Sequence, residues 1–337
     1  MIGKARRRIH FRRLFFVSAA AALLSLNALE TDASDSVKIA MGYIPNVQFA
    51  PYYVAVEKGY FRDEGIDVTF DYGMATDIMS LVANGSVDFG VSDGDQVIIA
   101  REKGIPVRVV YTMYVKYPVG IMALEESGIT DVRSLAGKRV GTPVPYGSNY
   151  FGLQVILGSE GMTLKDIDLS FIGYTQIESL LAGRVDASVV FINNEPVVLG
   201  DMGKSVRVIE AYPITPMVSA AIIAGERLIK QDPDLVRRFV RAVSRASVYA
   251  LENREKVLPL IKKYVPTLSD DNIKINRNVL LRSMELWVDD DIERNGSGYT
   301  SPEDWKRSID TMLSLGLIKK RVDPVGCYTN EFIVTGK

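Results

Sequence analysis

The sequence predicts an α/β protein of two lobes, in which each lobe is a mainly parallel sheet flanked by helices and a hinge joins the lobes. From Val37 onward, apolar segments with strand character alternate with helical segments, a pattern typical of parallel sheets with helices on both faces. One helix–turn–strand unit occurs twice, at 81–97 (LVANGSVDFGVSDGDQV) and at 180–197 (LLAGRVDASVVFINNEPV), which indicates duplicated lobes. From Asp232 the pattern is almost entirely helical.

The elements of the alternating part follow in chain order. Strands are predicted at 37–43, 66–72, 88–91, 107–115, 119–123, 139–142, 169–172 and 187–192. Helices are predicted at 49–58, 76–83, 95–103 and 150–158, and a glycine follows the end of each of the first three. The turns that end in Asp88 and Asp186 read as structural joints between helix and strand.

The C-terminal third supplies one more strand and a series of helices. Residues 218–229 predict a strand that leads into a helix, and Asp232 with Pro233 caps a long amphipathic helix at 234–253. Leu235, Phe239, Val243 and Ala246 share one face of that helix. Further helices are predicted around 254–264, 269–287 and 301–315.

We place this helical tail on the first lobe, which makes that lobe discontinuous. The predicted division is a signal peptide at 1–33, a first lobe of 34–117 plus 217–337, and a second lobe of 118–216. Crossing segments near 115–118 and 213–217 then form the hinge. Closure of the hinge around a ligand is the expected motion of such a protein.

The first 33 residues predict export. Six basic residues precede an apolar run at 14–26 (LFFVSAAAALLSL), and small residues follow, as in a secretory signal peptide. Arg12-Arg13 with the apolar residues after it is also similar to a twin-arginine signal, although Phe11 replaces the usual Ser or Thr. No later segment has the length of a membrane helix. We therefore expect a soluble protein in the periplasm, and not a lipoprotein, because no cysteine lies near the cleavage region.

Composition excludes several kinds of chemistry. His10 is the only histidine and leaves with the signal, and Cys327 is the only cysteine. The mature chain therefore lacks the residues for a Ser-His-Asp or Cys-His catalytic site, a histidine-rich metal site or an internal disulfide, and we expect neither a metal nor a cofactor. Loss of the six basic and two acidic residues of 1–33 changes the formal net charge from −1 to −5, which argues against nucleic acid as a partner.

Rings and amides follow the predicted strands. Open α/β sheets bind ligands beyond the carboxyl ends of their strands, so these residues form the candidate ligand site. Aromatic faces stack on flat π-systems, and amides both donate and accept hydrogen bonds, so we expect a planar heterocycle. The candidate ligand-binding residues are Tyr43, Asn46, Phe49, Asp95, Gln96, Tyr114, Tyr146, Ser148, Asn149, Tyr174, Gln176, Asn193, Asn194 and Glu195.

Structural roles compete with this interpretation at several positions. Asp93 or Asp95 could cap the helix that begins near Gln96, and Ser148 or Asn149 could cap the helix at 150–158. Rings inside or just after the first helix are more typical of a core than of a ligand wall; these are Tyr52, Tyr53, Tyr60 and Phe61.

The chain resembles the extracytoplasmic solute-binding proteins of ABC importers, in the branch related to thiamin-pyrimidine synthase. The resemblance extends from about Val37 to about Trp287. It rests on GYIPNVQFAPYYVAVEKGYFRDEGIDV (42–68), VANGSVDFGVSDGDQV (82–97), SLAGKRVGTP (134–143), PYGSNYFGL (145–153), GYTQ (173–176) and LLAGRVDA with NNEP (180–196). It implies the type II periplasmic-binding-protein fold, a ligand held between the lobes by a monomer, and delivery to a permease in the inner membrane.

The same resemblance bears on activity and ligand. Fungal synthases of this superfamily use a histidine and a cysteine-rich iron motif that the chain lacks, which favours transport over catalysis. YIPNVQFA, YGSNY and NNEP look closer to riboflavin binders than to formylaminopyrimidine binders, in which we expect a Trp near Tyr43. An isoalloxazine would stack on Tyr43, Phe49 or Tyr146. The ribityl chain would be bound by Asp95, Gln96, Asn149, Asn194 and Glu195.

Three alternatives to riboflavin stay open. A thiamin pyrimidine precursor, formylaminopyrimidine or hydroxymethylpyrimidine, would need fewer contacts, with Glu195 or Asp95 accepting from its amine. An exported pyrimidine-processing enzyme would have to use Lys116, tyrosine or paired carboxylates. A sulfonate, nitrate or taurine binder needs a cation at the ligand, and Lys116 is the one basic residue that we place near the cleft.

Overall fold

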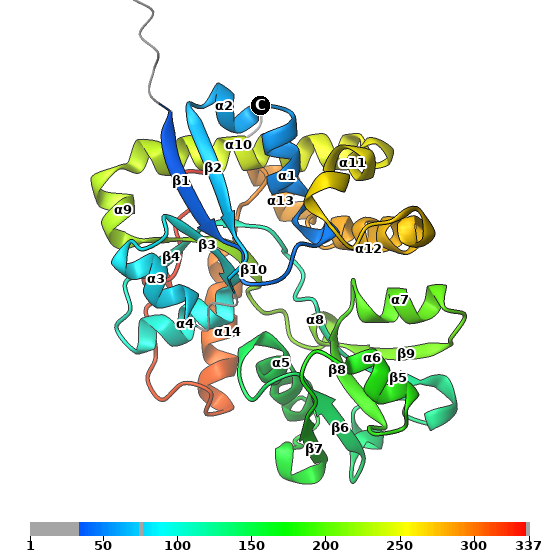
Figure 1. The fold of residues 1–337 in the computed structure, drawn as a ribbon. Coiled ribbons are helices and arrows are strands. Elements are labelled where there is room, and N and C mark those ends of the chain that lie inside the picture. Colours follow the sequence, from blue (N-terminus) through cyan, green and yellow to red (C-terminus); the bar gives the residue numbers. More distant parts are fainter. Residues whose placement is uncertain (1–33, 74–76, 335–337) are drawn as a thin grey trace, which may run out of the picture.

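Two five-stranded sheets form the two lobes of the protein (Figure 1). The structure is a computed structural model that describes residues 34–73 and 77–334, so the predicted signal peptide at 1–33 lies outside the described residues. The first sheet has the order β2-β1-β3-β10-β4, and the second has the order β7-β6-β8-β5-β9. The predicted two-lobed α/β architecture is therefore confirmed.

The strands occupy the following positions. In the first sheet they are β1 (Asp35–Ala40), β2 (Ile66–Asp71), β3 (Phe89–Asp93), β4 (Val107–Thr112) and β10 (Ala220–Gly225). In the second sheet they are β5 (Val119–Leu124), β6 (Arg139–Thr142), β7 (Asp168–Phe171), β8 (Ala187–Phe191) and β9 (Val206–Glu210).

Both sheets are mixed, with one antiparallel strand in the same position. β1 runs parallel to β2 and β3, and β10 pairs antiparallel with β3 and β4. In the second lobe β6 runs parallel to β7 and β8, and β5 pairs antiparallel with β8 and β9. β5 and β10 are the first strands after the chain crosses between lobes. They enter their sheets from the carboxyl ends of the neighbouring strands, which reverses their direction.

The matching strand orders support the duplication inferred from sequence. The repeated segments place β3 and β8 in the third position of each sheet. The aspartates before these strands make the same bond in both lobes: Asp88 Oδ2 accepts from the backbone N of Lys38 in β1 at 2.8 Å, and Asp186 Oδ2 accepts from the backbone N of Arg139 in β6 at 2.9 Å. The predicted structural role of both aspartates is confirmed.

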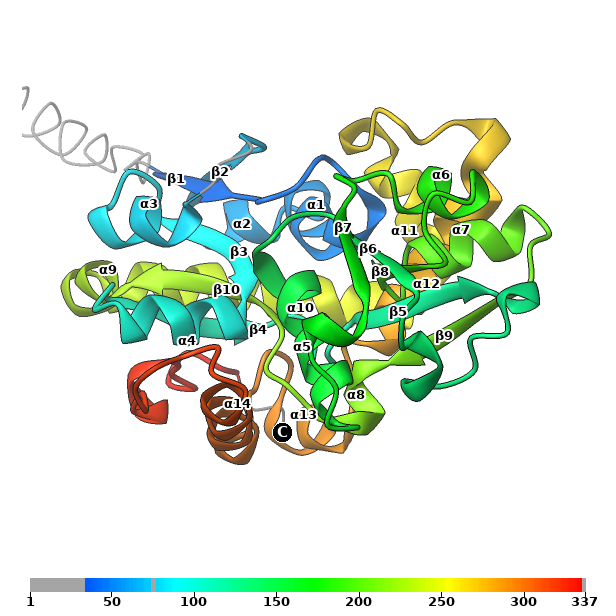
Figure 2. The same ribbon diagram turned by 90° about the horizontal axis from the view of Figure 1, so that it is seen from below.

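The helices cover both sheets (Figures 1 and 2). Those of the alternating part are α1 (Ala50–Glu57), α2 (Tyr60–Asp63), α3 (Ile78–Asn84), α4 (Gly94–Glu102), α5 (Gly147–Gly158), α6 (Gln176–Leu181), α7 (Glu195–Asp201) and α8 (Ala211–Ile214). The tail contains α9 (Glu226–Gln231), α10 (Pro233–Glu252), α11 (Arg254–Ile261), α12 (Ile273–Glu285), α13 (Asp290–Asn295) and α14 (Pro302–Ser314). Short 3-10 helices are η1 (Val47–Phe49), η2 (Glu125–Ser127), η3 (Arg133–Leu135), η4 (Leu164–Asp166), η5 (Lys262–Tyr264), η6 (Asp270–Asn272) and η7 (Pro324–Gly326).

Helix α10 anchors the first sheet. The Asp232 side chain accepts from the backbone N of Leu235 at 2.9 Å, and Pro233 occupies the first turn, as the sequence predicts. All four residues of the predicted apolar face are buried. Phe239 stacks on Phe89 of β3 with ring centroids 4.0 Å apart and an interplanar angle of 12°. Helix α10 is therefore part of the core of the first lobe and packs against the sheet that carries the strand-end residues.

The tail contacts both lobes. Trp305 of α14 is buried, stacks on Tyr328 and lies beside Gly94 at the start of α4. On the other side, Asn278 of α12 donates to Asp201 of α7 at 2.8 Å, which links the tail to the second sheet's helices. The lobe boundaries drawn from sequence stay a prediction. None of the helices within 34–73 and 77–334 combines the length and apolar character needed to cross a membrane.

Candidate functional site

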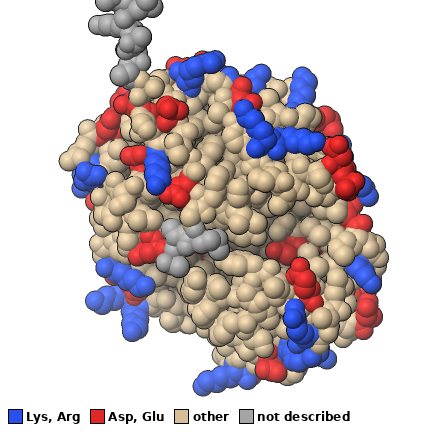
Figure 3. Space-filling model, viewed as in Figure 1, with Lys and Arg blue, Asp and Glu red and all other residues tan. Residues whose placement is uncertain are grey.

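Residues that follow the strands of the two sheets meet between the lobes. Tyr43, after β1, lies 6.0 Å from Tyr174, after β7, measured between ring centroids. Ser148 of α5 in the second lobe donates to Asp93 at the end of β3 in the first. Figure 3 shows one face of the molecule, where most of the surface is uncharged and acidic side chains lie on either side of the middle.

Three tyrosines form the aromatic part of the site. The rings of Tyr43 and Tyr174 are tilted by 58° and come from opposite lobes. Burial raises the pKa of Tyr43, and the charge of Glu195 and the nearby Tyr174 raise it further. Burial also raises the pKa of Tyr174, with a further contribution from Tyr146. Tyr146 and Tyr174 each keep 54% of their surface exposed, so both rings have free area for a ligand.

Two carboxyl groups and two hydroxyl groups form a polar cluster between the lobes. Ser148 Oγ lies 2.7 Å from Asp93 Oδ2 and 3.0 Å from Asp95 Oδ1. Tyr117 Oη, in the crossing segment after β4, lies 2.7 Å from Asp95 Oδ2 and 2.9 Å from the carbonyl oxygen of Ser148. Asp95 is fully buried, whereas Asp93 keeps partial exposure. Gly152 allows α5 to pack closely on β5, because a Cβ at this position would lie only 2.4 Å from the side chain of Val119.

This cluster has fewer hydroxyl protons than contacts. Ser148 and Tyr117 carry one hydroxyl proton each, yet they make four short oxygen–oxygen contacts with acceptors. Burial and, after it, the charge of Asp95 raise the pKa of Asp93 to about 7, against the opposing effect of the Ser148 hydroxyl. Burial likewise raises the pKa of Asp95. A proton on Asp93 or Asp95 supplies a third hydrogen in addition to the two hydroxyl protons. The short contacts therefore favour one proton shared by the two aspartates.

The capping roles considered for these residues are not observed. No side chain caps α4, whose N-cap position is Asp93, and Asp95 lies in the first turn. Helix α5 begins at Gly147, with Tyr146 at the N-cap and no capping side chain. Ser148 and Asn149 therefore lie inside the first turn of α5.

An amide network joins the second lobe to the first lobe and to the tail. Asn193, two residues after the end of β8, is fully buried and donates through Nδ2 to Ser283 Oγ of α12 at 2.9 Å and to Tyr114 Oη at 3.4 Å. Tyr114 Oη in turn donates to Gln48 Oε1 at 3.4 Å. The side-chain oxygens of Asn193 and Asn149 are both buried and have no hydrogen-bond partner within the described part of the chain. Both are acceptors available to a donor from a ligand.

Two predicted residues near β1 have local structural contacts. Asn46 Oδ1 accepts from the backbone N of Gln48 at 3.1 Å and caps η1. Phe49 is buried, with its ring edge-on to Tyr52 at 6.3 Å. Tyr52, Tyr53 and Phe61 are core residues, which agrees with the structural role expected for them.

The remaining predicted residues lie at helix starts. Gln96 Nε2 donates to Asp95 Oδ1 at 3.1 Å, and Gln176 is buried as the first residue of α6. Glu195 begins α7; its carboxylate accepts from the backbone N of Phe191 at 3.0 Å and from Asn194 Nδ2 at 3.3 Å. Burial raises the pKa of Glu195.

Four residues of the site were left out of the predicted set. Gln48 follows β1, Asp93 is the last residue of β3, and Tyr117 lies in the crossing segment after β4, so the rule that ligands bind at the carboxyl ends of strands points to all three. Ser283 lies inside α12, and no pattern in the sequence marks it. Lys116 donates to the carbonyl oxygen of Glu285 at 3.1 Å rather than to a residue of the cluster. Within the described residues, no group of three or more His, Cys, Asp or Glu is arranged to hold a metal ion.

Comparisons with known proteins agree with this architecture. The model of the family described as NMT1/THI5 like matches residues 46–257. The riboflavin-binding protein RibY of Chloroflexus aurantiacus is 35% identical over 303 residues, which cover 89% of this chain and 86% of that protein. The formylaminopyrimidine-binding protein of Halalkalibacterium halodurans is 26% identical over an alignment that covers 84% of this chain and 86% of that protein.

An enzyme and a solved structure complete the comparison. The 4-amino-5-hydroxymethyl-2-methylpyrimidine phosphate synthase of Legionella pneumophila is 25% identical, covering 88% of this chain and 92% of the synthase. The periplasmic aliphatic sulphonate binding protein SsuA from Escherichia coli superposes with a TM-score of 0.65 at 15% identity, covering 86% of this chain and 96% of SsuA. The expected periplasmic-binding-protein fold is confirmed.

Proposed function

The chain belongs to the NMT1/THI5-like family, and from this premise we propose that it is the periplasmic substrate-binding component of an ABC importer for riboflavin or a close flavin. The 35% identity to a riboflavin-binding protein extends over nearly the whole chain and supports this ligand. The protein is exported with loss of residues 1–33, binds its ligand between the lobes as a monomer, and delivers it to an inner-membrane permease.

The opposed rings of Tyr43 and Tyr174 are the observation that carries the proposal. They come from different lobes, and at 6.0 Å and 58° the two rings contact each other, so a flat ring system that separates them by hinge opening contacts both lobes at once. Stacking on aromatic faces favours a conjugated ligand. The unpartnered amide oxygens of Asn149 and Asn193 are acceptors for the single ring N–H of the isoalloxazine and for a hydroxyl group of the ribityl chain.

A thiamin pyrimidine precursor is the second candidate ligand, favoured by the similarity to a formylaminopyrimidine-binding protein. Such a ligand is a single ring and contacts less of the Tyr43 and Tyr174 faces than an isoalloxazine does. Its exocyclic amine donates to Glu195 or Asp95. The synthases among the relatives keep a pyrimidine-processing enzyme as a third possibility. The two binding functions and the enzyme are separated by the same set of assays.

The decisive experiment measures binding by purified protein without residues 1–33. Riboflavin fluorescence and thermal unfolding are recorded with riboflavin, hydroxymethylpyrimidine, formylaminopyrimidine and thiamin, with nitrate and a sulfonate as controls. A ligand at a hundred times its Kd stabilises the fold by about 2.7 kcal/mol. No shift with any heterocycle would reject the proposal. Conversion of a pyrimidine on long incubation, lost in Asp95→Asn, would favour the enzyme.

Tyr174→Ala should weaken riboflavin binding on the order of tenfold, because it removes one stacking face and its buried area. Phe171→Ala is the matched control: Phe171 is equally exposed at 54%, lies at the end of the same strand, and packs near Tyr150 instead of Tyr43. Fluorescence titration of both variants gives the two Kd values. Equal affinity of both variants and the wild type would show that the ligand does not stack on Tyr174.

A further inference from the structure

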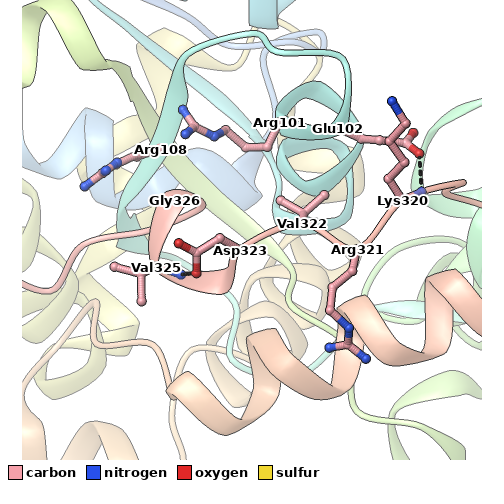
Figure 4. A pocket seen from close by; sticks show the side chains of 9 residues that line it. All are labelled: Arg101, Glu102, Arg108, Lys320, Arg321, Val322, Asp323, Val325 and Gly326. Atoms are coloured by element: carbon pink, nitrogen blue, oxygen red, sulfur yellow. Dashed lines mark hydrogen bonds between the residues drawn. The ribbon is translucent and has the colours of Figure 1, made fainter.

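A cavity of about 380 Å³ lies at the amino-terminal end of β4, whereas the candidate ligand site lies at the carboxyl ends of the strands (Figure 4). Helix α4, strand β4 and the chain around η7 line it. Four of its side chains are cationic, from Arg101, Arg108, Lys320 and Arg321, and two are acidic, from Glu102 and Asp323. The cavity is therefore strongly polar.

The two acidic side chains are already bound by the backbone. Glu102 Oε1 accepts from the backbone N of Lys319, and also from that of Lys320 at 2.9 Å. Asp323 Oδ1 accepts from the backbone N of Val325 at 3.1 Å. Glu102 thus holds the chain at 319–320 beside α4, whereas Asp323 caps η7.

Arg101 and Arg108 share a single carboxylate, that of Glu226, whereas Arg321 pairs with Asp310. Arg101 Nη1 donates to Glu226 Oε1 at 2.8 Å, and Arg108 Nε lies 3.5 Å from the same oxygen. Lys230 pairs with the other oxygen of Glu226 at 3.2 Å, so three cations share one carboxylate. Arg108 Nε is buried and makes no hydrogen bond within the described residues. An unpaired buried donor on a cation is costly, and an additional acceptor would remove that cost.

We propose that this cavity binds a tetrahedral oxyanion, either inorganic phosphate or the phosphoryl group of a larger molecule. The planar guanidinium groups of Arg101 and Arg108 suit the oxygen geometry of a phosphate, and Lys320 adds a point charge at the rim. The volume exceeds that of phosphate alone, which leaves room for an attached group. This site is separate from the proposed flavin site, because its lining residues lie at the amino-terminal end of β4 and not at the carboxyl ends of the strands.

The test is calorimetric titration of the protein lacking residues 1–33 with inorganic phosphate, at ionic strength held constant with chloride. The wild type should show saturable binding. Arg108→Gln should bind on the order of tenfold more weakly, because it removes a charge-assisted hydrogen bond. Lys320→Gln removes a charge at the rim without disturbing a strand and should also weaken binding. Lys165→Gln, the same change on η4 of the second lobe, should bind phosphate as the wild type does.

Glycerol 3-phosphate, titrated in parallel, separates the two sources of the phosphoryl group. Tighter binding of the ester than of inorganic phosphate indicates a larger phosphorylated ligand, and equal or weaker binding indicates the free ion. Riboflavin affinity of Arg108→Gln and Lys320→Gln should equal that of the wild type, which also shows that both are folded. A linear, non-saturating response, or the same phosphate affinity in all four proteins, would overturn the proposal.

Discussion

Phe239→Ala should lower the free energy of unfolding by about 3–5 kcal/mol, the usual cost of removing a buried aromatic ring and leaving a cavity. Phe239 is fully buried, stacks on Phe89 of β3 at 4.0 Å and lies 5.1 Å from the ring of Phe61. The cavity opens between α10 and the sheet, where the surrounding backbone cannot collapse onto it. Urea unfolding at constant temperature measures the change.

Val248→Ala is the matched control for this prediction. Val248 lies on the same helix, but 42% of its surface is exposed, so the substitution should change stability by no more than about 0.5 kcal/mol. A loss below about 1 kcal/mol in Phe239→Ala would mean that α10 does not anchor the first sheet. The result matters for the site, since β1 and β3 lead directly into Tyr43 and Asp93.

Continuous apolar runs in the sequence predict most of the strands, because strands that are buried on both faces consist mainly of apolar residues. Strand β6 was placed at its observed bounds, 139–142. The direction of β5 and β10 could not be read in this way, because an apolar run carries no sign of whether its neighbours run parallel or antiparallel. Strand β9 was missed because two of the five residues in VRVIE are charged and the strand pairs only with β5 at the sheet edge.

The strand-end rule located candidate residues better than it assigned their roles. It pointed to Tyr43, Tyr174 and Ser148, which the structure brings together across the lobes. It could not show that Phe49 turns into the core, because side-chain direction in a short helix depends on tertiary packing. Ser283 was inaccessible to sequence reasoning, since its contact with Asn193 joins segments 90 residues apart.

Asp93→Asn should make the stability of the protein less dependent on pH. Burial and the charge of Asp95 raise the pKa of Asp93 from 3.8 to about 7, so the folded state binds this proton more tightly than the unfolded state does. The stabilisation is complete below the pKa of Asp93 in the unfolded state. It is lost as pH rises toward the pKa in the folded state, so stability should decline between about pH 4 and pH 7. Asparagine has the same shape, carries no charge, and can donate to Ser148 Oγ.

At pH 8 the Asp93→Asn protein should be more stable than the wild type by about 1–3 kcal/mol, a value reduced because Asp93 keeps partial contact with solvent. Thermal unfolding at intervals from pH 4 to pH 9 measures the difference. Asp67→Asn is the control: Asp67 is exposed on β2, so its replacement should leave the pH profile unchanged. Parallel profiles for the wild type and Asp93→Asn would show that the aspartate pair does not retain a proton.

The proton shared by Asp93 and Asp95 should affect ligand binding, because the contacts of these two aspartates with Ser148 join the two lobes. The charge of Asp95 raises the pKa of Asp93 and the Ser148 hydroxyl lowers it, while the Asp93 charge raises the pKa of both Tyr114 and Tyr117. If the lobes close on the ligand, closure takes up a proton, and riboflavin affinity should fall as pH rises through about 7. In Asp93→Asn the affinity should be nearly constant over that range. A wild-type affinity independent of pH would mean that the cluster is already closed before the ligand binds.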